Sequence, residues 1–244
     1  MNTISALFRR ELKSYFATPV AYVFIVIFLV LMSTFTFYLG NFYERGQADL
    51  APFFVFHPWL YLLLVPAIAM RLWAEERKTG SIELLMTLPI TPWQAVLGKY
   101  LAAWAFTGVA LLLTFPIWIT VNYLGDPDNG AIVAAYIGSF LMAGGFLAIG
   151  ACLSATTRNQ VIAFVITVVV CFVFLASGFP MVLDFFTSWA PQILVDGIAS
   201  LSFLTHFENI SKGVIDLRDL IYFGLLISAF LYANTIVLRW KQAE

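Results

Sequence analysis

Six stretches of mostly apolar residues, each about as long as a helix that crosses a lipid bilayer, divide this sequence. A helix needs about 20 residues to cross roughly 30 Å of hydrocarbon. The stretches are residues 19–39, 58–73, 99–123, 132–153, 161–183 and 220–238. The chain is 61% hydrophobic and 11% charged, whereas a soluble domain has about 25% charged residues. We therefore expect an all-α integral membrane protein that forms one domain, residues 1–244, with six transmembrane helices.

The positions of lysine and arginine predict the orientation of these helices. Ten of the thirteen basic residues fall on the side that holds both termini and the loop 74–98. The other side has only Arg45, Lys212 and Arg218. Loops rich in Lys and Arg remain in the cytoplasm. We therefore expect both termini and the loop 74–98 to be cytoplasmic.

Residues 1–17 have the pattern of an amphipathic helix. Apolar side chains recur there at helical spacing, while Arg9, Arg10 and Lys13 lie on other faces and can contact lipid headgroups. Thr18 followed by Pro19 is a helix-start signal, with Thr18 as N-cap, so a break should separate an interfacial helix from the first span. The alternative is that residues 1–17 extend the first transmembrane helix into the cytoplasm.

The loop 74–98 is expected to contain one short helix. Gly80 can serve as N-cap for a helix Ser81–Thr87, and Glu83 places a carboxylate near its positive end. Pro89 disfavours helical geometry in the residue before it, which limits this helix to two turns. Most of its sides are apolar, so it suits a groove on a partner or, alternatively, the lipid surface.

A second helix-start signal precedes the third span. Thr91 is a predicted N-cap, Pro92 stands at the first helical position, and Gln94 stands at the third. Lys99 follows within the apolar stretch. We expect its ammonium group to extend back to the membrane interface.

The segment between spans five and six, residues 184–219, is expected on the outer side. The apolar runs in and next to this segment, including residues 182–186 and 193–204, are too short to cross a bilayer and are interrupted by Pro180, Pro191, Gly197 and Gly213. Short re-entrant helices in the outer leaflet, or a cap over the ends of the spans, would accommodate them.

Several classes of function lack the residues they need. No G-x-x-x-x-G-K-[ST] stretch is present to cradle ATP phosphates. The spans contain almost no ionisable residues between their ends, which argues against a proton-driven carrier or a hydrophilic ion pore. His57 and His206 are placed on the outer side, and Cys152 and Cys171 are interpreted as packing residues. We expect no catalytic, cofactor-binding or metal-binding residues and no nucleic-acid partner.

The loop 74–98 and its flanks resemble a known family. The matching residues are Met70-Arg71, Glu75-Glu76-Arg77-Lys78, Thr79-Gly80-Ser81, Glu83-Leu84-Leu85, Leu88-Pro89-Ile90 and Leu97-Gly98-Lys99. This pattern resembles the permease subunits of ABC-2 type transporters, although Ser81 stands where many members have Thr. Leu50-Ala51-Pro52-Phe53-Phe54, His57-Pro58-Trp59 and residues 200–207 resemble the gliding-motility-associated (GldF-like) branch.

The resemblance implies a permease that is not itself an enzyme. Two copies would form a homodimer with two ATP-binding subunits, which bind the ATP and magnesium, and a GldG-like auxiliary membrane protein is a further implied partner. The short loop helix would be a coupling helix that docks into the ATP-binding subunit. The implied coupling residues are Glu75, Glu76, Gly80, Ser81, Glu83, Leu84 and Leu85. The implied location is the bacterial inner membrane, and the implied direction is export.

Two other functions remain compatible with the sequence. The protein could relay the movement of an ATPase to an outer or auxiliary protein through residues 184–213, without moving cargo. It could also be an ATP-independent channel or structural subunit, which the loop 74–98 disfavours because such a protein needs no ATPase contact. The residues do not identify a cargo.

Overall fold

The structure, a computed structural model, describes residues 3–87 and 89–242, and of residues 84–86 and 242 it describes the backbone alone. The regular structure in this part of the chain is helical, which confirms the all-α prediction. The elements are α1 Thr3–Ala17, α2 Pro19–Thr34 with a π-helical end Phe35–Leu39, α3 Ala51–Phe54, α4 His57–Ala69, α5 Ala74–Thr79, α6 Ser81–Thr87, α7 Pro92–Leu112, α8 Phe115–Leu124, α9 Asn129–Ser154, α10 Gln160–Ala176, α11 Pro180–Thr187, α12 Gln192–Ala199, α13 Phe203–Ser211 and α14 Leu217–Gln242.

Five helical segments of the described chain are long and apolar enough to cross a membrane. They are Pro19–Leu39, Ala51–Thr79, Pro92–Leu124, Asn129–Ser154 and Leu217–Lys241. A sixth candidate is a bent pair, Gln160–Ala176 and Pro180–Thr187, which passes the same test only as a pair. These segments correspond in order to the six predicted spans.

The predicted fifth span, residues 161–183, is not one straight helix. The axes of α10 and α11 differ by 72° at the break. Pro180 begins α11, and its ring lacks the N–H that a continuing helix would need. Gly178 lies within the break against Ser202, where a Cβ would overlap the hydroxyl oxygen. The bend is therefore fixed by a proline on one side and a close backbone approach on the other.

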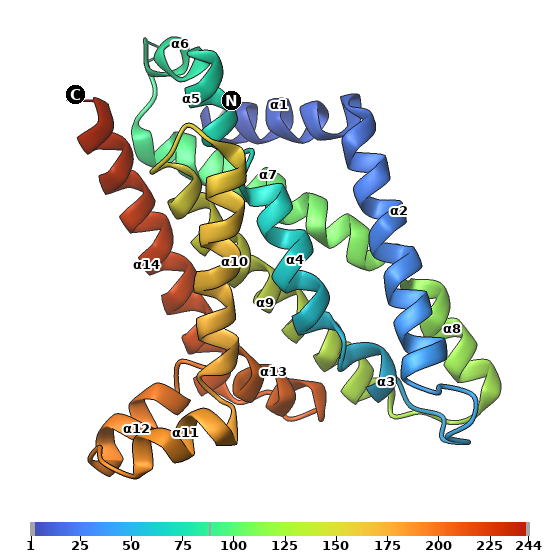
Figure 1. The fold of residues 1–244 in the computed structure, drawn as a ribbon. Coiled ribbons are helices and arrows are strands. Elements are labelled where there is room, and N and C mark those ends of the chain that lie inside the picture. Colours follow the sequence, from blue (N-terminus) through green and yellow to red (C-terminus); the bar gives the residue numbers. More distant parts are fainter. Residues whose placement is uncertain (1–2, 88, 243–244) are drawn as a thin grey trace.

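Helix α9 is the centre of the bundle, with α4, α7, α10, α13 and α14 packed around it (Figure 1). Its small residues allow the neighbours to approach closely, as is common between helices in membranes. A Cβ on Gly145 would lie 2.6 Å from Cε1 of Phe203, and one on Gly144 would lie 2.8 Å from Trp104. Phe146 is completely buried on the same helix.

Helices α1 and α2 are separate, which excludes the alternative of a continuous first helix. Thr18 has an extended backbone conformation between them, with φ −107° and ψ 138°. Its side chain does not cap α2 as predicted, because the hydroxyl donates instead to the Tyr15 carbonyl at 3.0 Å. Helix α1 lies across one end of the bundle, from which α2 runs to the opposite end (Figure 1).

The third helix begins at the predicted start signal, before the apolar stretch that starts at residue 99, and it is interrupted. Thr91 and Gln94 form the predicted capping box, with N–H to side-chain oxygen distances of 3.0 and 3.3 Å. Helix α7 therefore starts at Pro92, and its first turns lie outside the apolar stretch from which the boundary at residue 99 was inferred. The helix stops at Leu112, and α8 starts at Phe115 with Pro116 in its first turn.

Short helices occupy the segment 184–219, as predicted. Helices α11 and α12 pack on each other and form a hairpin beside the end of the bundle opposite α1 (Figure 1). Helix α13 packs on α9 and buries Phe203, Phe207 and Ile210. Large apolar side chains of the hairpin, among them Met181 and Ile193, are exposed in the chain as described.

The tight packing at Gly145 gives a test of the fold. We expect Gly145→Ala to lower the free energy of unfolding by about 1–3 kcal/mol, because the added methyl group overpacks the buried Phe203 ring. Thermal unfolding in detergent measures this loss. Gly224→Ala is the control, since a Cβ there has no neighbour within 4 Å. Equal midpoints for the two variants would contradict the packing described for α9.

Candidate functional site

The loop between the second and third spans forms two short helices rather than the one predicted. Helix α6 has the predicted bounds, and α5 precedes it, residues Ala74–Thr79. Gly80 separates them with φ 74° and ψ 0°, a left-handed conformation that ends α5. Gly80 was predicted as the N-cap of α6, and its carbonyl does accept the Glu83 N–H at 3.2 Å. Its conformation, however, is that of a helix C-cap.

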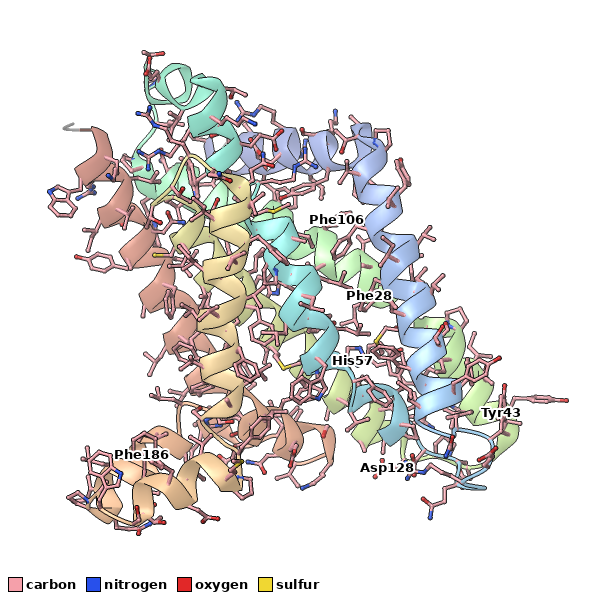
Figure 2. The ribbon with its side chains drawn as sticks, viewed as in Figure 1. Phe28, Tyr43, His57, Phe106, Asp128 and Phe186 are labelled. Atoms are coloured by element: carbon pink, nitrogen blue, oxygen red, sulfur yellow. The ribbon has the colours of Figure 1, made fainter. Side chains whose placement is uncertain are left out.

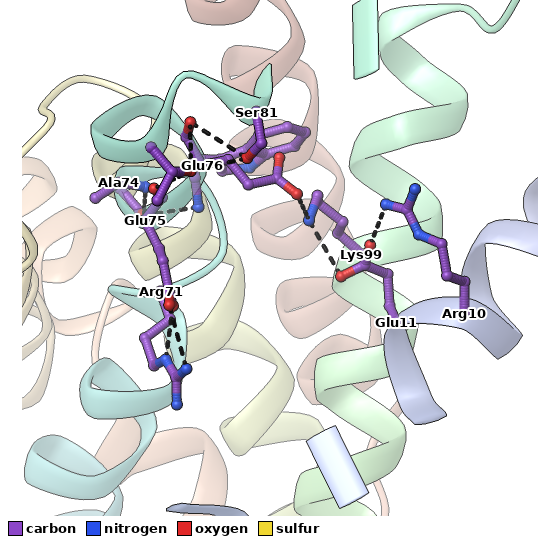
Figure 3. Close-up of polar contacts among 11 residues, drawn as sticks. Arg10, Glu11, Arg71, Ala74, Glu75, Glu76, Ser81 and Lys99 are labelled. Atoms are coloured by element: carbon purple, nitrogen blue, oxygen red, sulfur yellow. Dashed lines mark hydrogen bonds and ion pairs between the residues drawn. The ribbon is translucent and has the colours of Figure 1, made fainter. Parts of the chain in front are cut away.

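Lys99 lies at the junction of α1, α5 and α7 (Figure 3). Its Nζ is 2.6 Å from Oε1 of Glu76 on α5 and 3.1 Å from Oε2 of Glu11 on α1. The ammonium also lies 5.4 Å from the ring centroid of Trp73. The Lys99 side chain is only 4% exposed. Two carboxylates therefore hold the ammonium inside the protein, while its predicted position at the membrane interface stays a prediction.

The carboxylate of Glu11 is stabilised in its charged form. Burial by itself would raise its pKa, but the charge of Lys99 and hydrogen bonds from Arg10 and Lys99 outweigh burial and leave the pKa below its ordinary value of 4.5. Arg10 Nη2 donates to Oε1 of Glu11 at 2.5 Å. A partly buried charge cluster of this kind holds its members in place, since removing one partner leaves an uncompensated charge.

A polar cavity of about 260 Å³ adjoins this junction. Arg71 lines it and donates through Nε to Oε2 of Glu75 at 2.8 Å. Ser14 and Tyr15 of α1 form the facing wall. The cavity thus separates α1 from the start of α5, except where Lys99 connects them.

Ser154, at the end of α9, fixes the start of α5. Its Oγ accepts the N–H groups of Trp73 at 3.2 Å and Ala74 at 3.1 Å, and its hydroxyl donates to the Met70 carbonyl at 3.0 Å. Arg77 Nη1 also donates to the carbonyl of Ala155. These bonds satisfy backbone groups at the start of α5 that lack helical partners. The base of the loop is therefore attached to α9 as well as to α7.

The predicted coupling residues divide between the base and the tip of the loop. Glu75 and Glu76 belong to the base, whereas Gly80 and Glu83 are exposed at the tip. Ser81 Oγ lies 2.9 Å from Thr79 Oγ1, which links the ends of α5 and α6. The side chains of Leu84 and Leu85 lie outside the described residues. The predicted interfacial residues Arg9, Arg10 and Lys13 are exposed on α1.

The sequence interpretation missed Glu11, Trp73 and Ser154, and it did not pair Lys99 with a carboxylate. A signal for Lys99 was present, because an ionisable residue within an apolar stretch generally has a charged or polar partner. No local pattern identifies that partner, since Glu11 is 88 residues away in the sequence.

The two histidines are not an exposed pair. His57, predicted on the outer side, is completely buried among aromatic rings, and its Nδ1 lies 3.2 Å from the Phe53 carbonyl oxygen. His206 pairs with Asp219, Nδ1 to Oδ1 2.5 Å, and its Nε2 lies 2.9 Å from the Ser200 carbonyl oxygen. Within the described residues, no three His, Cys, Asp or Glu side chains converge as metal ligands would.

Comparison with known families identifies the class of protein. The family described as ABC-2 family transporter protein matches residues 41–238. The chain therefore belongs to this family and is the membrane permease component of an ABC-2 type transporter, without ATPase activity of its own. Membership implies a separate ATP-binding subunit as partner. A comparison with curated proteins gave no match.

The Lys99 cluster predicts a large effect of one substitution. Lys99→Met leaves the carboxylates of Glu11 and Glu76 without their cation, so we expect the free energy of unfolding to fall by about 3 kcal/mol. Adding Glu11→Gln and Glu76→Gln to this variant should restore most of the lost free energy of unfolding. Equilibrium unfolding in detergent measures the difference, with Lys212→Met as control, because Lys212 is 71% exposed and 3.9 Å from its partner. Equal losses at both lysines would refute a structural role for the cluster.

The lowered pKa of Glu11 predicts a pH dependence. Its folded-state pKa is below its ordinary value of 4.5, so its contribution to stability is present above pH 4.5 and is lost as the pH falls through the folded-state pKa. We expect wild type to lose stability between about pH 5 and pH 3, and Glu11→Gln to lose less over that range. Unfolding midpoints over this range are the measurement. Parallel curves would contradict the assignment.

Proposed function

We propose that this permease is moved by its ATP-binding subunit through the tip of the α5–α6 loop, which acts as a coupling element. The observation that carries the proposal is the contrast between the two ends of the loop. The tip protrudes beyond the α1 end of the bundle (Figure 1), and Gly80 and Glu83 are exposed there. The base is attached to α7 through Lys99 and to α9 through Ser154.

The contacts at the base of the loop determine which helices a displacement of the tip would move. The ion pair between Glu76 and Lys99 joins α5 to α7 over 2.6 Å, and the pair between Glu11 and Lys99 adds α1. The hydrogen bonds of Ser154 add α9. A displacement of α6 would therefore be passed to α1, α7 and α9 and change their packing against the rest of the bundle.

We place the protein in the GldF-like branch, as an exporter of the bacterial inner membrane with both termini in the cytoplasm. In this proposal two copies form a homodimer and pair with two ATP-binding subunits, which bind ATP and magnesium, with a GldG-like membrane protein as auxiliary partner. ATP binding draws the two ATP-binding subunits together and shifts each α6. Arg9, Arg10 and Lys13 would hold α1 at the lipid headgroups while this happens.

A mechanical relay without cargo is the second candidate. The observation that favours it is the α11–α12 hairpin, which packs mainly on itself and exposes apolar side chains such as Met181 and Ile193. A surface of this kind is available to an outer or auxiliary protein. Cargo uptake into inverted vesicles separates the two functions, because a relay hydrolyses ATP without accumulating cargo.

The coupling proposal is tested by two substitutions at the same residue. Proline has φ fixed near about −65°, so Gly80→Pro cannot keep the φ of 74° that sets α6 relative to α5. We expect vanadate-sensitive ATP hydrolysis by the purified complex to fall about tenfold, which corresponds to about 1.4 kcal/mol. Asparagine tolerates the left-handed conformation, so Gly80→Asn should retain activity.

Two further variants locate the contact. Glu83→Arg reverses a charge at the exposed tip and should release the ATP-binding subunit during co-purification. Glu208→Arg is the matched control, because Glu208 is also exposed but lies on α13 at the opposite end. A complex that is stable and active in both Gly80→Pro and Glu83→Arg would refute coupling through this loop.

A further inference from the structure

An open apolar groove of about 410 Å³ runs between α7, α8 and α9. Two pairs of stacked rings form its walls, Trp104 on Phe140 with centroids 4.5 Å apart and Trp118 on Tyr136 with centroids 5.8 Å apart. Gly108 also lines the groove and allows the Phe140 ring to lie against α7, because a Cβ there would lie 2.9 Å from Cε2 of Phe140. The residues that line the groove include none of the Lys99 cluster and none of the coupling loop.

Hydrocarbon is the medium around this groove. Leu112, Phe115, Val133 and Ile137 line it and are exposed, and they belong to segments long and apolar enough to span the membrane. Closely packed interiors leave few voids, and a wall that faces an empty gap loses its dispersion contacts. A flexible acyl chain can follow the irregular aromatic walls of such a groove.

One end of the groove carries polar groups. Trp118 lines the groove, and its Nε1 donates to Oδ1 of Asn129 at 2.7 Å. Asn122 and Asn129 exchange hydrogen bonds of 3.1 Å through their amides. These amides lie at the ends of the helices joined by residues 125–128, at the end of the bundle opposite α1.

The charged residues near this polar end are mostly acidic, although Lys212 lines a neighbouring pocket together with Asp128. Asp126 and Asp128 lie in the connection between α8 and α9, and the sequence has no Lys or Arg between Lys99 and Arg158. A phospholipid headgroup placed there would therefore find carboxylates for an ammonium group and no basic side chain from these helices for an additional negative charge.

We propose that this groove is a binding site for one acyl chain of a zwitterionic, amine-bearing phospholipid. The chain lies along the stacked rings, and the headgroup lies beside Asn122 and Asn129 with its ammonium toward Asp126 and Asp128. The lipid belongs to the leaflet opposite α1. It packs over the break between α7 and α8, where Thr114 Oγ1 lies 3.0 Å from the Tyr136 hydroxyl oxygen.

Native mass spectrometry with added phosphatidylethanolamine or phosphatidylglycerol tests the site. We expect one saturable phosphatidylethanolamine adduct on wild type. Ile137→Phe fills the groove and should weaken this binding about tenfold, which is about 1.4 kcal/mol. Ile166→Phe on α10 is the matched control, because Ile166 is 40% exposed and Ile137 is 41% exposed. We expect the control to bind like wild type and phosphatidylglycerol to bind more weakly than phosphatidylethanolamine.

Several outcomes of this experiment would overturn the proposal. Binding that does not saturate indicates an ordinary lipid shell, and equal affinity for phosphatidylglycerol removes the headgroup assignment. Unchanged lipid binding by Ile137→Phe places the lipid elsewhere. Loss of a dimer mass from Ile137→Phe, with no loss of lipid, assigns the groove to a second copy of the chain.

A second measurement applies to the wild-type protein and does not depend on the folding of Ile137→Phe. Brominated phosphatidylethanolamine is added in increasing fraction to phosphatidylglycerol nanodiscs, and tryptophan fluorescence is recorded. We expect a component of the quenching to saturate at low fraction, and to disappear when Trp104 and Trp118 are both replaced by Phe. Quenching that only follows the bulk lipid fraction would overturn the site.

Discussion

The ammonium of Lys99 is the charge on which the arrangement of the α1 end depends. A charge removed from water is stable only with compensating partners, and here those partners come from two other helices. Glu11 links α1 to α7, in addition to the packing of Leu7 against Gly98, and Glu76 links α5 to α7. Without this cluster, the first helix and the loop would be separated by a polar cavity.

The second constraint is the close packing around α9. Glycines on this helix allow Phe203 and Trp104 to approach its backbone, and Ser154 at its end binds the backbone where α5 begins. The same helix therefore carries the core of the bundle and supports the coupling loop. A movement received at the tip reaches the membrane-spanning part through two distinct contacts, one ionic at Lys99 and one through hydrogen bonds at Ser154.

Apolar length and local helix signals predicted much of the fold. The six apolar stretches gave the order of the candidate spans, and the Thr91–Gln94 capping box and the bounds of α6 followed from local residue patterns. Pro180 was recognised as an interruption, but the fifth span was still extended to residue 183, because the apolar stretch continues through the proline. Thr18 marked a break but not a cap, since its hydroxyl has a competing acceptor in the Tyr15 carbonyl.

The site was less predictable than the fold. Glu75 and Glu76 were identified by resemblance, and the structure places both at the base of the loop. The partners that define the base could not be predicted, because Lys99 and Ser154 join segments distant in sequence. Helix α5 was missed because its end is set by the left-handed conformation of Gly80, which was interpreted as a helix start.

The central claim is that α1 and the coupling loop move as one unit because Lys99 joins them. The most direct test is the distance between spin labels at Lys13→Cys on α1 and Lys78→Cys on α5, in the complex with the ATP-binding subunit and with Cys152 and Cys171 replaced by Ala. Our account predicts the same distance in the nucleotide-free and vanadate-trapped states, and a change between these states when Lys99→Met is added. The account would be contradicted if the distance changed between the two states by the same amount in the protein with Lys99 and in the Lys99→Met variant.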